Sequence, residues 1–173
     1  MTAVAGEPIE LPWLDFPRFR CFGCSPANPI GLALKFHRTE SGEVAARTTF
    51  SAEYASYPGI VHGGIVNVLV DEVMGDMIAI EQGLLAFSIT LRTTMLLPLR
   101  IGTEYVTTAR VTGTGNGKIR TEADVTGPDG EVHMMASAVY QPIRSDQARE
   151  LMGIGDDEFD QIKHYFDHQI GQS

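Results

Sequence analysis

The chain has 173 residues, of which 43% are hydrophobic and 20% charged, and these values are typical of one globular domain with a core of its own. Its net charge of -9 at pH 7 repels nucleic-acid phosphates, so no nucleic-acid partner is expected. The N-terminus lacks the basic start and apolar run of a signal peptide, and no apolar stretch is long enough to cross a membrane, so we expect a cytoplasmic protein.

Residues 1–30 are rich in proline and aromatic side chains, which predicts an irregular extension packed on the domain. This segment holds both cysteines, Cys21 and Cys24, in a CxxC arrangement. A zinc site would need two further ligands at motif spacing, and none follows. A redox CxxC would open a helix, whereas Pro26 and Pro29 come next. We therefore expect two reduced thiols in a loop, and no metal site.

From residue 31 onward the pattern is typical of β-strands surrounding one helix. The first two strands, 32–36 and 44–50, are separated by a Ser-Gly turn and predict a hairpin. Residues 65–82 contain no proline, and their apolar side chains cover most of a helix circumference, which predicts a long buried helix. Turn residues separate the four strands expected after it, at 87–97, 104–112, 118–127 and 131–140.

Six strands with one buried helix after the second predict an α+β fold, in which an antiparallel sheet wraps around the helix over residues 31–143. Residues 144–173 form a tail of different character. Asp156 and Asp157 are suited to cap a helix there, with Phe159, Ile162 and Phe166 on one face. We expect this helical appendage to pack on the domain or on a partner subunit.

The residues His62-Gly63-Gly64 stand directly before the predicted helix. The N–H groups of a helix's first turn and the positive end of its dipole suit a developing oxyanion, and glycines let another group approach the backbone closely. The alternative is a tight turn in which His62 is a plain N-terminal or packing residue. The pattern leaves both interpretations open.

Asp71 lies two turns after Gly64 on an otherwise apolar helix. Burying a carboxylate without partners is costly, so an acid in such a segment needs a reason. Asn67 lies four residues earlier on the same face. The alternative is that Asp71 lies on a solvated stripe of the helix together with Gly75.

Ser88 and Thr90 are two residues apart in the strand that follows the helix, so we expect both side chains on one face of that strand. A hydroxyl there would orient a water molecule or a carboxylate. Serine and threonine are common in strands, so this signal is weak by itself.

Together, the His62-Gly63-Gly64 motif, Asp71 nine residues after the histidine, and Ser88 ten residues before Pro98 resemble the hot-dog thioesterases of the phenylacetate-degradation type. The opening of many such domains is similar to residues 21–32, which read CFGCSPANPIGL here. The resemblance runs from about Cys21 to Tyr140. It implies a hot-dog domain that hydrolyses an acyl-CoA or a related acyl thioester.

The resemblance also implies roles for the motif residues. The N–H of Gly64 would polarise the thioester carbonyl, Asp71 would act on water as general base or attack as nucleophile, Ser88 would position water, and His62 would anchor the turn. Gly63, Asn67 and Thr90 would contact the substrate. In such enzymes the helix start of one subunit faces the carboxylate of the other, so the active form would be a homodimer or a homotetramer built from dimers.

Relatives often carry two adjacent basic residues at the start of the fifth strand, where they contact coenzyme A phosphates. Here that place reads NGKIR, so Lys118 and Arg120 are the expected substitutes, with a solvated strand edge as the alternative. The acyl carrier is thus coenzyme A or an acyl-carrier protein, and no cofactor is expected beyond the coenzyme A of the substrate. Two other functions stay open, a non-catalytic acyl-thioester-binding module and a hot-dog hydratase or dehydratase.

Overall fold

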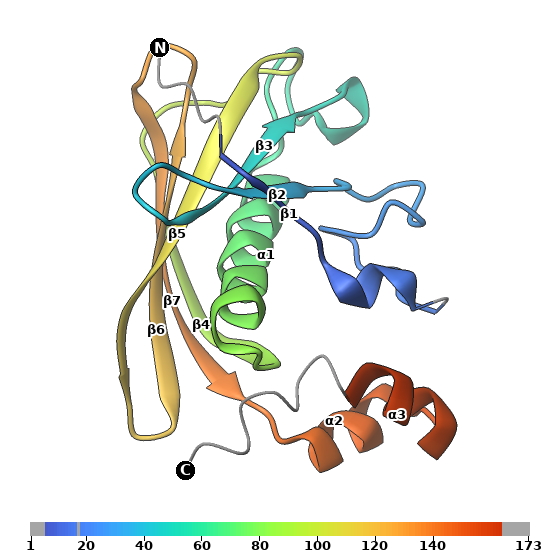
Figure 1. Ribbon diagram of the computed structural model, residues 1–173. Helices are drawn as coiled ribbons and strands as arrows, with labels where there is room; N and C mark the ends of the chain where they lie inside the picture. The colour runs from blue at the N-terminus through green and yellow to red at the C-terminus, as the bar shows by residue number, and fades with distance from the viewer. Residues whose placement is uncertain (1–5, 17, 164–173) are drawn as a thin grey trace.

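The computed structural model describes residues 6–16 and 18–163, and Figure 1 shows the arrangement of its elements. Two short 3-10 turns, at 12–15 and 52–54, accompany the longer elements. In chain order these elements are β1 (Pro8–Ile9), β2 (Lys35–Arg38), β3 (Val44–Thr49), α1 (Gly63–Gln82), β4 (Ala86–Met95), β5 (Glu104–Gly115), β6 (Lys118–Thr126), β7 (Val132–Pro142), α2 (Ser145–Met152) and α3 (Asp156–Lys163).

The strands form one seven-stranded antiparallel sheet in the order β1-β2-β3-β5-β6-β7-β4. The sheet curves around α1, which lies along its concave face, while α2 and α3 lie beyond the end of β7 (Figure 1). This is the hot-dog arrangement, and it confirms the predicted fold class. Among the described residues, no helix combines the length and the apolar character needed to cross a membrane.

Helix α1 is fixed at both ends by local chemistry. His62 has an extended backbone, and its ring Nδ1 accepts the N–H of Gly64 at 2.9 Å, which makes it the N-cap. Gly83 adopts the left-handed conformation at φ 63° and ends the helix. Between them seven apolar side chains are buried against the sheet: Val66, Leu69, Val70, Val73, Met74, Met77 and Ile78. The prediction of a long buried helix is confirmed.

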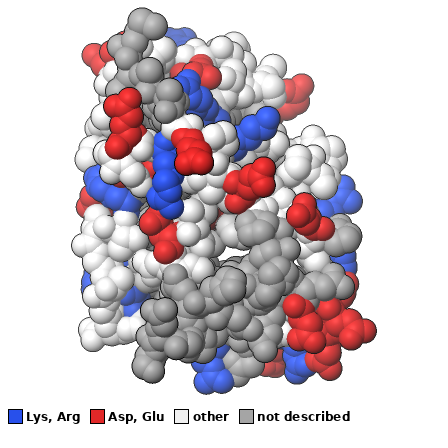
Figure 2. Space-filling view, viewed as in Figure 1, with Lys and Arg blue, Asp and Glu red and all other residues white. Residues whose placement is uncertain are grey.

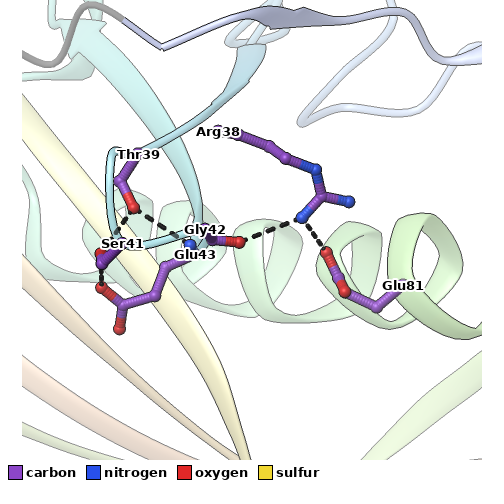
Figure 3. Close-up of polar contacts among 6 residues, drawn as sticks. All are labelled: Arg38, Thr39, Ser41, Gly42, Glu43 and Glu81. Atoms are coloured by element: carbon purple, nitrogen blue, oxygen red, sulfur yellow. Dashed lines mark hydrogen bonds and ion pairs between the residues drawn. The ribbon is translucent and has the colours of Figure 1, made fainter.

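A polar contact holds the β2–β3 hairpin against the far end of α1. The guanidinium of Arg38, at the end of β2, donates to the carboxylate of Glu81 on α1 and to the Gly42 carbonyl in the hairpin turn (Figure 3). Gly42 adopts φ 87°, which the turn requires and which glycine accepts without strain. The hairpin therefore contacts α1 by side chains as well as through the sheet.

The strand predictions differ most from the structure near the start of the chain, and β5 also runs three residues beyond its predicted end at 112, to Gly115. The first hairpin strand begins at Lys35, three residues later than expected, after Ala33 interrupts extended geometry at φ 47°. The short strand β1 is absent from the sequence prediction, because two residues that include a proline carry no periodic signal. Its segment nonetheless contributes to the core, since Leu11 and Trp13 are buried with the helix and sheet residues.

The C-terminal tail contains two short helices. α3 begins at Asp156, as the paired aspartates predict, with three acidic residues in its first turn. Helix α2 is an addition that the sequence pattern does not predict. The side chain of Ile162, and Phe166 as a whole, lie outside the described part of the structure.

Candidate active site

A cavity of about 470 Å³ opens between α1, the N-terminal segment, the start of β4 and the loop after α2. Asp71 lies in its wall, together with other polar and apolar side chains from five parts of the chain, Tyr140 of β7 among them. Its lining residues are Trp13, Phe16, Arg18, Phe19, Arg20, Cys21, Asp71, Glu72, Gly75, Asp76, Ala79, Leu84, Leu85, Ala86, Phe87, Ser88, Tyr140, Met152 and Ile154. Asp71 is therefore an acid of α1 that faces a cavity.

The carboxylate of Asp71 is held by Tyr140, a residue that the sequence did not single out. The Tyr140 hydroxyl donates to Oδ1 of Asp71 at 2.7 Å and lies 2.8 Å from the Asp71 carbonyl oxygen. Burial, and then the charge of Asp71, raise the pKa of Tyr140 well above its usual value, so the hydroxyl keeps its proton and remains a donor. The contact fixes one carboxylate oxygen of Asp71, and the described residues provide no hydrogen bond to the other.

Ser88 lies in the same cavity wall as Asp71. In the β4–β7 ladder Ser88 is the partner of Tyr140, and cross-strand partners point to the same face, so both side chains lie on the face that carries α1. The register of β4 and β7 is therefore consistent with a Ser88 hydroxyl near the Asp71 carboxylate.

Thr90 does not share that face, and the prediction that it does is wrong. A β-bulge inserts Ile89 between the two pairs, so Ser88 pairs with Tyr140 but Thr90 pairs with the adjacent Val139. One extra residue reverses the alternation, which places Thr90 on the outer face of the sheet.

The start of α1 forms a second group of predicted residues, separate from Asp71. Asp71 lies seven residues after Gly64, about 10 Å along the helix axis, and the cavity wall does not include residues 62–64. The N–H of Gly64 is already used, because it donates to the ring of His62. Among the described residues nothing accepts the N–H of Gly63, which makes that group the free donor of the first turn.

Asn67 lies between the two groups on the same side of α1. Gly64, Asn67 and Asp71 are spaced at three and four residues, so they form one stripe of the helix, and all three are at least partly exposed. The Oδ1 atom of Asn67 is buried and has no hydrogen-bond partner within the described chain. Because Asp71 of this stripe contacts Tyr140 of β7, the stripe is not the freely solvated one that the alternative interpretation described.

The predicted basic pair lies away from the cavity. Lys118 and Arg120 are exposed on β6, and the residue between them, Ile119, is buried toward α1, so both basic side chains lie on the outer face of the sheet. Thr90 and Arg120 are both partners of Val139, which puts them in one row of that face.

Two arginines that the sequence did not single out line the cavity instead. Arg18 pairs with Glu158 of α3 at 2.9 Å, and Arg20 donates to the Ala27 carbonyl. Figure 2 shows acidic side chains gathered at the lower right of the molecule, and the first turn of α3 carries three acidic residues. Arg18 thus connects the cavity wall to the acidic start of α3. The sequence does not predict the position of these arginines, because they belong to no motif and the irregular N-terminal segment has no repeating pattern.

Replacing Tyr140 with phenylalanine tests whether the hydroxyl positions Asp71. We expect kcat to fall about tenfold with little change in KM, because the ring still fills its buried place while the carboxylate loses its hydrogen bond. The measurement is steady-state turnover of the acyl thioester substrate that the sequence resemblance implies. Tyr105→Phe is the matched control, since Tyr105 is equally buried and its hydroxyl accepts the Arg100 N–H outside the cavity. Equal losses in both variants would contradict a positioning role.

The chain is similar to known proteins in sequence profile and in fold. The sequence profile of the thioesterase superfamily matches residues 58–133, from the loop before α1 into β7. A solved thioesterase superfamily protein is similar at 25% identity and a TM-score of 0.62, over 67% of this chain and 57% of that one, so this chain spans little more than half of its length.

Two other solved structures are similar at lower identity. A hypothetical thioesterase of Streptococcus pneumoniae, solved with coenzyme A, is 18% identical with a TM-score of 0.58, over 64% of this chain and 85% of that one. The E. coli PaaI protein, from the phenylacetic acid degradation operon, is 18% identical with a TM-score of 0.59, over 65% and 81%. A comparison with curated proteins finds no match.

Proposed function

We propose that this chain, which has the hot-dog fold and matches the thioesterase superfamily over residues 58–133, hydrolyses an acyl-CoA or a related acyl thioester. The observation that carries the proposal is the carboxylate of Asp71, held by Tyr140 in the wall of a cavity that also contains Ser88. A carboxylate with one oxygen fixed and the other facing the cavity is suited to activate water.

In this mechanism the free oxygen of Asp71 takes a proton from a water molecule as the water attacks the thioester carbonyl carbon. The carbonyl oxygen gains negative charge, which backbone N–H groups at a helix start stabilise. The carbon–sulfur bond then breaks, the thiolate leaves and takes up a proton, and the products are a carboxylic acid and a thiol. Ser88 orients the water on the face that it shares with Tyr140.

Within this scheme the oxyanion donor is assigned to Gly63 rather than to Gly64. The Gly63 N–H has no acceptor in the described chain, whereas the Gly64 N–H becomes available only if the ring of His62 turns away. His62 then serves as the helix cap that sets the direction of both N–H groups.

The helix start and Asp71 come from two copies of the chain in our proposal. They are about two helical turns apart within one chain, too far to act on a single carbonyl. The sheet edge at β4 has a strand partner only on its β7 side, within the described residues, and it presents about half-exposed Phe87, Ile89 and Met95. An open edge with apolar side chains favours pairing with a second copy, which would bring one helix start to the other cavity.

The carrier part of the substrate is proposed to be coenzyme A. Its phosphates require positive charge, and the candidates are Arg18 and Arg20 at the cavity and Lys118 and Arg120 on the outer face. The hypothetical thioesterase of Streptococcus pneumoniae was solved with coenzyme A, which supports the same carrier here. An acyl-carrier protein is the alternative.

The test is thiol release from a panel of aliphatic and aromatic acyl-CoAs, measured with a colorimetric thiol reagent. We expect release with at least one acyl group, and the panel ranks the acyl groups at once. If the folded protein releases no thiol from any acyl-CoA, the same assay with acyl-carrier-protein thioesters separates a different carrier from a non-catalytic binding module. A changed double bond without thiol release would instead indicate a hydratase.

A further inference from the structure

The two cysteines of the N-terminal loop meet two carboxylates of α1. Sγ of Cys21, Sγ of Cys24 and a carboxylate oxygen of Glu72 all lie within 4.8 Å of one another. Asp76, one turn after Glu72 on the same side of the helix, is close enough to interact with Cys24 and Glu72. Residues about 50 positions apart in the sequence thus form one cluster of four groups.

The backbone of the loop is shaped around this cluster. The Gly23 N–H donates to Sγ of Cys21 at 3.3 Å, a contact that favours the thiolate, and Sγ of Cys21 lies 2.7 Å from Oε1 of Glu72. A Cβ atom on Gly23 would lie 2.2 Å from the Glu72 side chain, so only glycine lets the loop approach α1 this closely. Cys24 is buried in the main core, and both cysteines are free of disulfides.

Asp76 contributes a second, independent observation. Its Oδ2 atom is buried and has no hydrogen-bond partner in the part of the chain that the structure describes. A buried carboxylate oxygen without a donor is costly unless a proton or a cation satisfies it.

We propose that Cys21, Cys24, Glu72 and Asp76 form a binding site for one zinc-class divalent ion. Thiolate and carboxylate ligands together suit zinc, which takes sulfur at about 2.3 Å and oxygen at about 2.0–2.2 Å in tetrahedral sites. In such a site any two ligand atoms are about 4 Å apart or less. The ligand atoms of Cys21, Cys24 and Glu72 already lie within 4.8 Å of one another, so small side-chain movements would bring them to that spacing.

Four protein ligands leave no open position, so the role of the ion is structural. It ties the N-terminal segment to α1 beside Asp71, and through Cys21 and Glu72 it braces one wall of the cavity. This site goes beyond the proposed hydrolysis and does not depend on it. The sequence predicted no metal because the two carboxylates lie on a helix rather than at the spacing of a zinc motif.

The test uses the untagged full-length chain, reduced and stripped of metal, then loaded with Zn²⁺ and freed of excess by gel filtration. We expect about one zinc per chain by elemental analysis, and zinc-edge X-ray absorption with both sulfur and oxygen ligands. Cobalt in place of zinc should give the near-ultraviolet charge-transfer band of a thiolate ligand. Zinc should also raise the Tm of the wild-type chain.

Matched variants separate the metal site from the hydrolysis. Glu72→Gln and Cys24→Ser should weaken zinc binding at least about tenfold, whereas Asp71→Asn, one residue away on the same helix, should bind zinc as the wild type does while losing hydrolysis. Circular dichroism verifies that each variant is folded. Absence of zinc uptake by the reduced wild type, absorption without sulfur ligands, or unchanged binding in Cys24→Ser would each overturn the site, and none of these results bears on thiol release.

Discussion

Replacing Asp71 with asparagine is expected to lower kcat by about 10³-fold, and alanine by at least as much, because either change removes the proton acceptor of the reaction. Asparagine has the same shape and can still accept the Tyr140 hydroxyl proton, so the fold and the cavity are expected to persist. The measurement is kcat and KM for thiol release, with KM expected to change little.

The matched control for this variant is Glu81→Gln on the same helix. Glu81 pairs with Arg38 at the far end of α1 and does not line the main cavity, so its loss should leave kcat near the wild-type value (Figure 3). A folded Asp71→Asn protein with near wild-type turnover would remove Asp71 from the mechanism. The function would then have to be sought among the other polar groups of the cavity.

Replacing Gly63 with proline is expected to lower kcat by about 10²- to 10³-fold, because it deletes the N–H of the first turn of α1 that has no acceptor within the described chain. The backbone conformation at residues 62 and 63 is compatible with a proline at position 63. Gly63 is the first helical residue, where proline is well tolerated, and His62 before it has φ -66° and ψ 128°, a conformation that a following proline prefers. Thermal unfolding should therefore show a Tm close to that of the wild type, while thiol release falls.

Gly63→Ala is the control that keeps the N–H and adds a Cβ atom. That atom would lie 2.9 Å from Cε of Met95, the flexible end of a side chain, so a small movement of Met95 accommodates it. If alanine and proline lower kcat equally, crowding rather than the lost N–H is responsible, and the assignment of the oxyanion donor to Gly63 fails.

These two variants also test the proposed pairing of subunits when they are mixed. If the helix start of one copy serves the Asp71 of the other, a heterodimer of Gly63→Pro and Asp71→Asn contains one site with both defects and one intact site. Mixing the two inactive proteins under conditions that exchange subunits should then restore up to about a quarter of the wild-type activity, because half of the random dimers are mixed. No recovery, despite demonstrated exchange, would place both groups within one chain.

The sheet and the helix were predictable because their signals are periodic over many residues. The buried apolar residues of α1 recur at spacings of three and four residues along one face, and the later strands are long and bounded by clear turns. The position of Asp71 followed from the same regularity. An acid within such an apolar helix is conspicuous from its neighbours in the sequence alone.

The remaining features of the site depend on contacts that no short spacing encodes. Tyr140 meets Asp71 across 69 positions of sequence, and its strand pattern is that of any buried tyrosine. The bulge at Ile89 moves the Thr90 side chain to the other face of the sheet, and nothing in the sequence of β4 indicates where the bulge lies. Glu72 and Asp76 join Cys21 and Cys24 only because the irregular N-terminal loop folds back onto α1.

The cavity wall is formed partly by the helix and sheet and partly by segments near the two ends of the chain. Asp71, Ser88 and Tyr140 stand on the long helix and the sheet, whereas Trp13, Phe16, Phe19, Met152 and Ile154 come from segments near the two ends of the chain. Substitutions in those end segments are therefore expected to reshape the cavity without moving the Asp71 carboxylate. Under the proposed hydrolysis, the choice of acyl group and the activation of water would thus depend on different parts of the chain.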